Sequence, residues 1–252
     1  MPESPRPAAA GDYWSESRRP LVSLAFVAPI LALYEAGVLF LGTKALRNGA
    51  DVWLRRFLEA LDFGHYFLLP LLTVAILLGW HYTARQPWSV RRDVVSRMFL
   101  ESVLLAVGLR LLLQVEAVML AGLGAVLAPA AAVGGGLRAS LGNLVGFLGA
   151  GVYEELLFRL VLLSAAVWLL ARWGFSATRG AVLAALVTSF VFAAAHYVGP
   201  YGDPIELGQF SFWFAALFRF LAGVFFSALF VCRGFGIVVG THAAYDILAM
   251  LG

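Results

Sequence analysis

Apolar runs of about 20 residues recur along this chain of 252 residues, and short connections separate them. Hydrophobic residues make up 62% of the sequence and charged residues only 13%, whereas a soluble domain is about half apolar and a quarter charged. A run of about 20 apolar residues is long enough to cross a bilayer as a helix. The sequence therefore predicts an all-α fold, a polytopic transmembrane helical bundle.

Seven spans are expected, with an amphipathic segment after the first. In the segment 44–61, apolar side chains recur at helical spacing against charged ones, which indicates an interfacial amphipathic helix. Residues 1–20 are polar and rich in Pro and Ala, so we expect a disordered N-terminus followed by a single membrane domain over 21–252. The expected spans are 21–42, 63–82, 98–127, 141–173, 176–197, 210–232 and 235–252.

The net charge of +3 comes from basic residues in the connections, so we expect the lipid bilayer, and no nucleic acid, as a partner. Positive residues gather on the cytoplasmic side of membrane proteins. The basic connections 83–97 and 172–179 lie on that side if the N-terminus is cytoplasmic. The low lysine content and the abundance of Ala, Leu and Arg favour a bacterial source and hence the bacterial inner membrane.

Two adjacent glutamates, Glu154 and Glu155, lie in the middle of an apolar run. A charge at bilayer depth costs at least a few kcal/mol and is usually kept for a function. Arg159 follows Glu155 by four residues, so the two share a helix face and can neutralise each other. Glu154 is rotated by about 100° and has no such partner on its own helix. We therefore expect Glu155 to be structural and Glu154 to serve as a general base.

Two histidines place further ionisable groups in the last third of the chain. His196 ends one apolar run, and His242 begins a segment in which Asp246 follows one helical turn later. Three late helices thus each carry an ionisable side chain at depth. Because each is costly in lipid, we expect them to converge on one interior, hydrated cavity.

The order of these motifs on successive spans is Glu-Glu-x-x-x-Arg, Phe-x-x-x-His and His-x-x-x-Asp. Over residues 141–252 they resemble the CAAX-protease and bacteriocin-processing family (CPBP, or ABI) of intramembrane glutamic endopeptidases. The resemblance implies that Glu154 activates the attacking water and that His196 is its partner on that water. It also implies that His242 and the residue four later stabilise the oxyanion of the tetrahedral intermediate.

The same resemblance makes Glu155 and Arg159 a supporting ion pair. The family's last motif often ends in Asn, whereas this chain has Asp246 there. A carboxylate cannot donate to an oxyanion unless it is protonated. We therefore expect Asp246 to orient His242 and hold it charged, as the aspartate of a catalytic triad does.

The expected function is hydrolysis of a peptide bond in a membrane-anchored protein or peptide, without a cofactor. A zinc-dependent intramembrane protease is one alternative, because Glu154, His196 and His242 could hold Zn²⁺. No His-Glu-x-x-His motif supports it. A bacteriocin-immunity protein, or a transporter that uses buried carboxylates as a proton relay, is another. Inverted repeats would favour a transporter, and the sequence has none.

Overall fold

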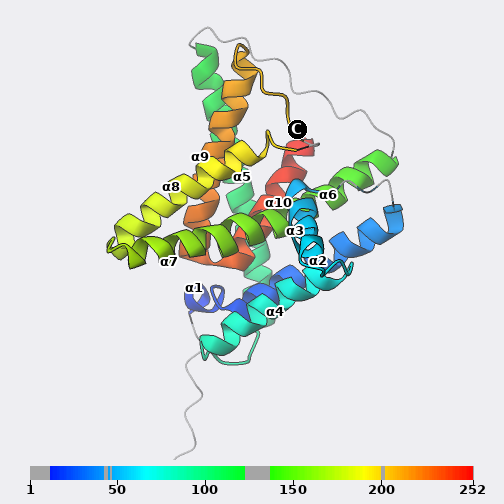
Figure 1. The fold of residues 1–252 in the computed structure, drawn as a ribbon, viewed down its shortest axis with the longest axis vertical. Helices are drawn as coiled ribbons and strands as arrows, with labels where there is room; N and C mark the ends of the chain where they lie inside the picture. Colours follow the sequence, from blue (N-terminus) through cyan, green and yellow to red (C-terminus); the bar gives the residue numbers. More distant parts are fainter. Residues whose placement is uncertain (1–11, 43–44, 46, 123–136, 200–201, 252) are drawn as a thin grey trace, which may run out of the picture.

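The computed structural model describes residues 12–42, 45, 47–122, 137–199 and 202–251. Within these ranges the chain is helices and connections, with no strand (Figure 1). The predicted all-α class is confirmed. The helices are α1 (Tyr13–Glu16), α2 (Pro20–Leu41), α3 (Gly49–Ala60), α4 (Leu68–Thr83), α5 (Arg92–Gly122), α6 (Leu137–Glu155), the π-helix η2 (Leu156–Leu163), α7 (Ser164–Arg172), α8 (Ala177–Ala195), α9 (Phe210–Arg233) and α10 (Phe235–Leu251).

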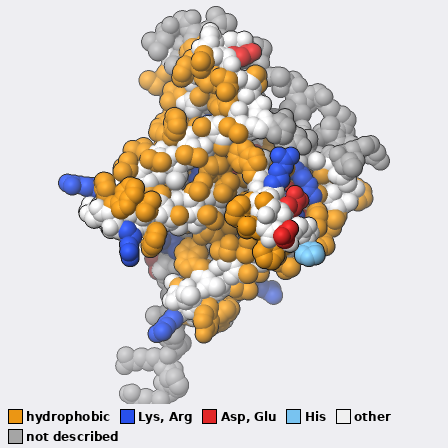
Figure 2. Space-filling view, in the orientation of Figure 1, with side chains coloured by type: hydrophobic (Ala, Val, Ile, Leu, Met, Phe, Trp, Pro, Cys, Tyr) orange, Lys and Arg blue, Asp and Glu red, His pale blue; other side chains and the backbone are white. Residues whose placement is uncertain are grey.

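Four of these helices are long and apolar enough to cross a membrane: α2, α5, α8 and α9. Two shorter apolar helices, α4 and α10, lie where further spans are expected. Hydrophobic side chains cover most of the face in Figure 2, and basic side chains lie mainly toward its edges. This surface suits a protein embedded in lipid, and the total of seven spans stays a prediction.

The helix expected over 141–173 is one continuous path through α6, η2 and α7. Its middle is π-helical, beginning directly after the two glutamates. A π-helix spaces its backbone hydrogen bonds five residues apart, and such segments are frequent at functional sites. The wider turn rotates the following residues relative to an α-helix, a change that hydrophobic periodicity does not reveal.

The start of the described chain differs from the expected disordered N-terminus. Tyr13 lies in the short helix α1 and donates a hydrogen bond from its hydroxyl to Glu101 of α5. Arg233 at the end of α9 lies 4.0 Å from the centre of the Trp14 ring and 2.6 Å from Glu101. These partners are remote in sequence, so local composition could not predict that this segment is ordered.

Helix α10 lies at the centre of the bundle and packs against α2, α5, α6 and α9 (Figure 1). It approaches α6 closely because Gly151 has no side chain. A Cβ atom at Gly151 would lie 2.8 Å from the Cβ of Ala243 and 2.9 Å from the carbonyl oxygen of Val239. This contact, one turn before Glu154, brings the glutamates of α6 against His242 of α10.

Candidate active site

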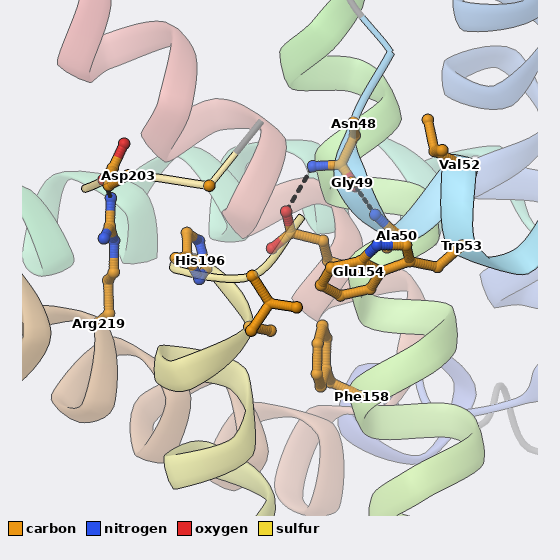
Figure 3. A pocket seen from close by; sticks show the side chains of 13 residues that line it. Asn48, Gly49, Ala50, Val52, Trp53, Glu154, Phe158, His196, Asp203 and Arg219 are labelled. Atoms are coloured by element: carbon orange, nitrogen blue, oxygen red, sulfur yellow. Dashed lines mark hydrogen bonds and ion pairs between the residues drawn. The ribbon is translucent and has the colours of Figure 1, made fainter. Parts of the chain in front are cut away.

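Glu154 lies at the end of α6 with its side chain buried, and its two oxygens have different surroundings (Figure 3). Oε1 accepts a hydrogen bond from the side-chain amide of Asn48. Oε2 makes no hydrogen bond with any residue that the structure describes and lies 3.8 Å from Nε2 of His242. One oxygen is therefore anchored, and the other can take a proton from a reactant.

His196 caps the C-terminal end of α8 beside the same carboxylate. Its Nδ1 donates to the carbonyl oxygen of Phe192 at 2.8 Å, a bond that leaves Nε2 as the acceptor of a neutral ring. The backbone N–H of Asp203 donates to the carbonyl oxygen of His196 at 2.9 Å and ties the following connection to this residue. Glu154 and His196 both line a cavity of about 150 Å³.

His242 of α10 lies between the two glutamates of α6. Its Nδ1 is 2.6 Å from Oε1 of Glu155, while its Nε2 points toward Glu154. The imidazole stacks on the ring of Phe226, with centroids 4.6 Å apart and an angle of 15° between the planes. The hydrogen bond and the stacked ring hold the imidazole in one orientation, so its free nitrogen faces the site.

Glu155 and Arg159 form an ion pair with 3.0 Å between Oε1 and Nη1. The Arg159 side chain is only 1% exposed. Its guanidinium also donates to the carbonyl oxygen of Gly223 at 3.3 Å and lies 4.3 Å from the centre of the Phe192 ring. Arg159 therefore joins the π-helical segment to α8 and α9 and compensates a carboxylate that has no access to solvent.

A second cavity of about 340 Å³ lies between α8, α9 and α10. His196, His242 and Asp246 line it together with aromatic side chains such as Phe214 and Phe218. His196 lines both cavities, so the structure brings together the four residues that the sequence singles out for catalysis. A reactant held here would meet a carboxylate, two imidazoles and an apolar wall.

Residues 137–248 match the family model described as Type II CAAX prenyl endopeptidase Rce1-like. We call residues 137–248, which are similar to this family, the Rce1-like segment. It begins with α6 and holds the seven residues of the three motifs that carry the resemblance, so the expected resemblance to the CAAX-protease family is confirmed for this segment. The match supports a CAAX-protease-type intramembrane endopeptidase, a hydrolase that acts on membrane-associated protein. No curated protein and no solved structure matches the chain.

The contacts of His242 within the Rce1-like segment differ from the expected triad arrangement. Asp246 lies 3.7 Å from Nε2, beyond hydrogen-bond distance, whereas Glu155 occupies the Nδ1 side. The reason is helical geometry: a residue four positions later reaches only one edge of the imidazole, and the neighbouring helix α6 reaches the other. Glu155 therefore orients His242 in addition to neutralising Arg159.

Two further residues of the site lie outside the sequence prediction. Asn48 precedes α3 and contacts Glu154 across a separation of 106 residues, for which no local pattern gives a signal. Arg219 of α9 pairs with Asp203 of the connection between α8 and α9, and it lines both cavities.

The zinc-dependent alternative needs nitrogen and oxygen ligands for the metal, and the side chains of Glu154, His196 and His242 carry such atoms. In the described parts of the chain, however, no three side chains of His, Cys, Asp or Glu are arranged as a set of metal ligands. Chelation tests the alternative directly.

Proposed function

We propose that this chain is a glutamic-type intramembrane endopeptidase that hydrolyses a peptide bond of a membrane-tethered protein or peptide. The observation that carries the proposal is the convergence of Glu154, His196 and His242, with the free oxygen of Glu154 3.8 Å from His242. The cavity beside them measures about 150 Å³. Water takes up about 30 Å³ per molecule in the liquid, so the cavity has the volume of about five waters.

In this mechanism Glu154 is the general base. Its Oε2 accepts a proton from a water molecule, and the water oxygen attacks the carbonyl carbon of the substrate. Nε2 of His196 accepts a hydrogen bond from the second O–H of the water and thereby positions it, because Nδ1 is already bonded to the backbone. The carbon–oxygen double bond opens, and the carbonyl oxygen takes up the negative charge.

His242 stabilises that oxyanion. Its Nδ1–H donates to Glu155, so a protonated imidazole has its second N–H, at Nε2, directed into the site. A donor held in advance toward the developing charge costs no reorganisation during the reaction. The carbon–oxygen double bond then re-forms as the carbon–nitrogen bond breaks, the departing nitrogen receives the proton that Glu154 took from water, and a carboxylic acid is left. Protons and electrons balance without a metal or another cofactor.

The substrate reaches this site within the bilayer. The apolar helices around the site and the Rce1-like segment support a substrate that is anchored in, or attached to, the membrane. The loop charges favour a cytoplasmic N-terminus, and the low lysine content with abundant Ala, Leu and Arg favours a bacterial inner membrane.

Glu154→Gln tests the base. Glutamine keeps the size and the acceptor for Asn48 but removes basicity. We expect turnover to fall by about 10²–10⁴-fold with KM unchanged, which is the usual contribution of a positioned base. The assay measures cleavage of a lipid-anchored fluorogenic peptide with a free C-terminal carboxylate by the full chain in proteoliposomes. Wild-type turnover in Glu154→Gln would reject the glutamate mechanism.

Exhaustive chelation of the wild-type protein in the same assay tests the cofactor. We expect activity to survive, because no proposed step uses a metal. Activity that is lost on chelation and restored by Zn²⁺ alone would favour the zinc-dependent protease and leave the same residues as its ligands.

A further inference from the structure

We propose that Asn48, which lies outside the Rce1-like segment, is a positioning residue for Glu154. The proposal rests on the function above, because it concerns how the base is held. Asn48 precedes α3 in the N-terminal half of the chain, and its side-chain amide donates to Oε1 of Glu154. The residues that carry the family resemblance therefore do not complete the site by themselves.

Both ends of the Asn48 carboxamide are engaged. Its Oδ1 accepts a hydrogen bond from the backbone N–H of Ala50 at 2.7 Å and so caps the first turn of α3 (Figure 3). The amide nitrogen must then point the other way, toward Glu154. A single side chain thus couples the start of α3 to the orientation of the carboxylate.

The hydrogen bond from Asn48 keeps the Glu154 carboxylate apart from His242. The free oxygen of Glu154 lies 3.8 Å from Nε2 of His242, just beyond a hydrogen bond. Without a donor on Oε1 the carboxylate could rotate and pair directly with the imidazole, since a charged pair in a site of low dielectric attracts strongly. That pairing would occupy the oxygen that must accept a proton from water. Asn48 holds the carboxylate in the arrangement that leaves this oxygen free.

Helix α3 is itself fixed by a buried ionic network. Arg55 contacts Asp51 at 2.6 Å and Glu35 of α2 at 3.0 Å, and Tyr34 of α2 donates to Asp51 at 2.8 Å. Tyr153 of α6 donates to Glu35 at 2.5 Å. Burial by itself would lower the pKa of Arg55, but the two carboxylates raise it above its ordinary value, so the guanidinium stays charged.

The network ends at Tyr153, and Asn48 binds the next residue, Glu154. The start of α3 therefore contacts α6 directly at Glu154 and indirectly, through Glu35 of α2, at Tyr153. Trp53 of α3 also forms part of the wall of the catalytic cavity. These two links limit how far Asn48 can move away from the base.

Two substitutions of Asn48 separate its role as a hydrogen-bond donor to Glu154 from its role as the cap of helix α3. Asp and Ser both cap helices about as well as Asn, but neither presents an amide donor to Glu154. Asn48→Asp in addition places a second carboxylate against the first. We expect this like-charge contact to move the protonation midpoint of Glu154 to higher pH by about one unit or more. Asn48→Ser should move the midpoint in the same direction by less.

The midpoint is measured by infrared titration of the full chain in detergent. The carbonyl stretch of the protonated Glu154 carboxyl group is identified by subtracting the spectrum of Glu154→Gln. The titratable or charged groups that share its surroundings, besides its neighbour Glu155, are Arg159, His196, Asp203, Arg219, His242 and Asp246. All of them are unchanged in the Asn48 variants, so a shift relative to wild type reports on Asn48.

Asn143→Asp is the matched control. It makes the same chemical change on α6 itself, 11 residues before Glu154, or about 16 Å along the helix. We expect it to leave the midpoint unchanged. In the peptide-cleavage assay, Asn48→Ser should lower kcat by about 10–100-fold at unchanged KM, because a hydrogen bond to a charged group is lost, and the acid limb of the pH profile should move up.

A Glu154 midpoint in Asn48→Asp and Asn48→Ser equal to that of wild type would overturn the proposal. Should the Asp variant fail to fold, the Ser variant alone decides in the same way. The infrared titration needs no substrate. The proposal for Asn48 can therefore fail while Glu154→Gln still abolishes cleavage. It can also be supported while the protease function is rejected.

Discussion

Arg159→Met should destabilise the protein strongly, because it leaves a carboxylate buried without its cation. The Arg159 side chain is 1% exposed and that of its partner, Glu155, is 0% exposed. Removing one member of a buried pair costs about 3–5 kcal/mol. In a chain of this size each kcal/mol lowers Tm by about 2–4 °C, so the expected fall is about 6–20 °C.

The assay is thermal unfolding in detergent, followed by circular dichroism. Arg172→Met is the matched control, since this residue of α7 is exposed and its side chain lies over the Trp168 ring, 5.8 Å from the ring centre. Substitutions at exposed sites usually change stability by at most about 0.5 kcal/mol. The double variant Glu155→Gln with Arg159→Met removes the uncompensated charge and should recover much of the loss. If Arg159→Met unfolds at the same temperature as Arg172→Met, the ion pair does not stabilise the fold, and the reasoning is refuted.

Two further predictions concern the packing of α6 against α10 and the role of His196. Gly151→Ala inserts a methyl group 2.9 Å from the backbone oxygen of Val239. It should lower the free energy of unfolding by about 1–3 kcal/mol and lower turnover, because it moves Glu154 away from His242. The control Gly108→Ala, where nothing lies within 4 Å of the added Cβ, should be neutral or stabilising in the same unfolding measurement. An unchanged Tm in Gly151→Ala would show that the two helices adapt to the added methyl. His196→Gln should retain the wild-type Tm but lose about 10²-fold or more in turnover. The control His65→Gln, in an exposed connection, should retain both the Tm and the turnover. A fully active His196→Gln would remove His196 from the mechanism.

Sequence spacing within one helix predicted the local contacts of the site. The pairing of Glu155 with Arg159 needs only a four-residue separation on an apolar helix, and the structure has that ion pair. The presence of Glu154, His196 and His242 at depth likewise indicated an interior cavity, because the bilayer offers them no other solvation. The cleavage roles of these residues stay predictions that the experiments above address.

The sequence by itself determined that this is a helical membrane protein with a small set of ionisable residues, since composition and run length decide how a chain partitions into lipid. Only the tertiary structure decided which of those residues meet. His242 bonds to Glu155 across 87 residues and Asn48 to Glu154 across 106. Such contacts depend on the rotation of each helix and on close approaches such as that at Gly151. Local periodicity carries neither quantity, because both arise only when the helices pack.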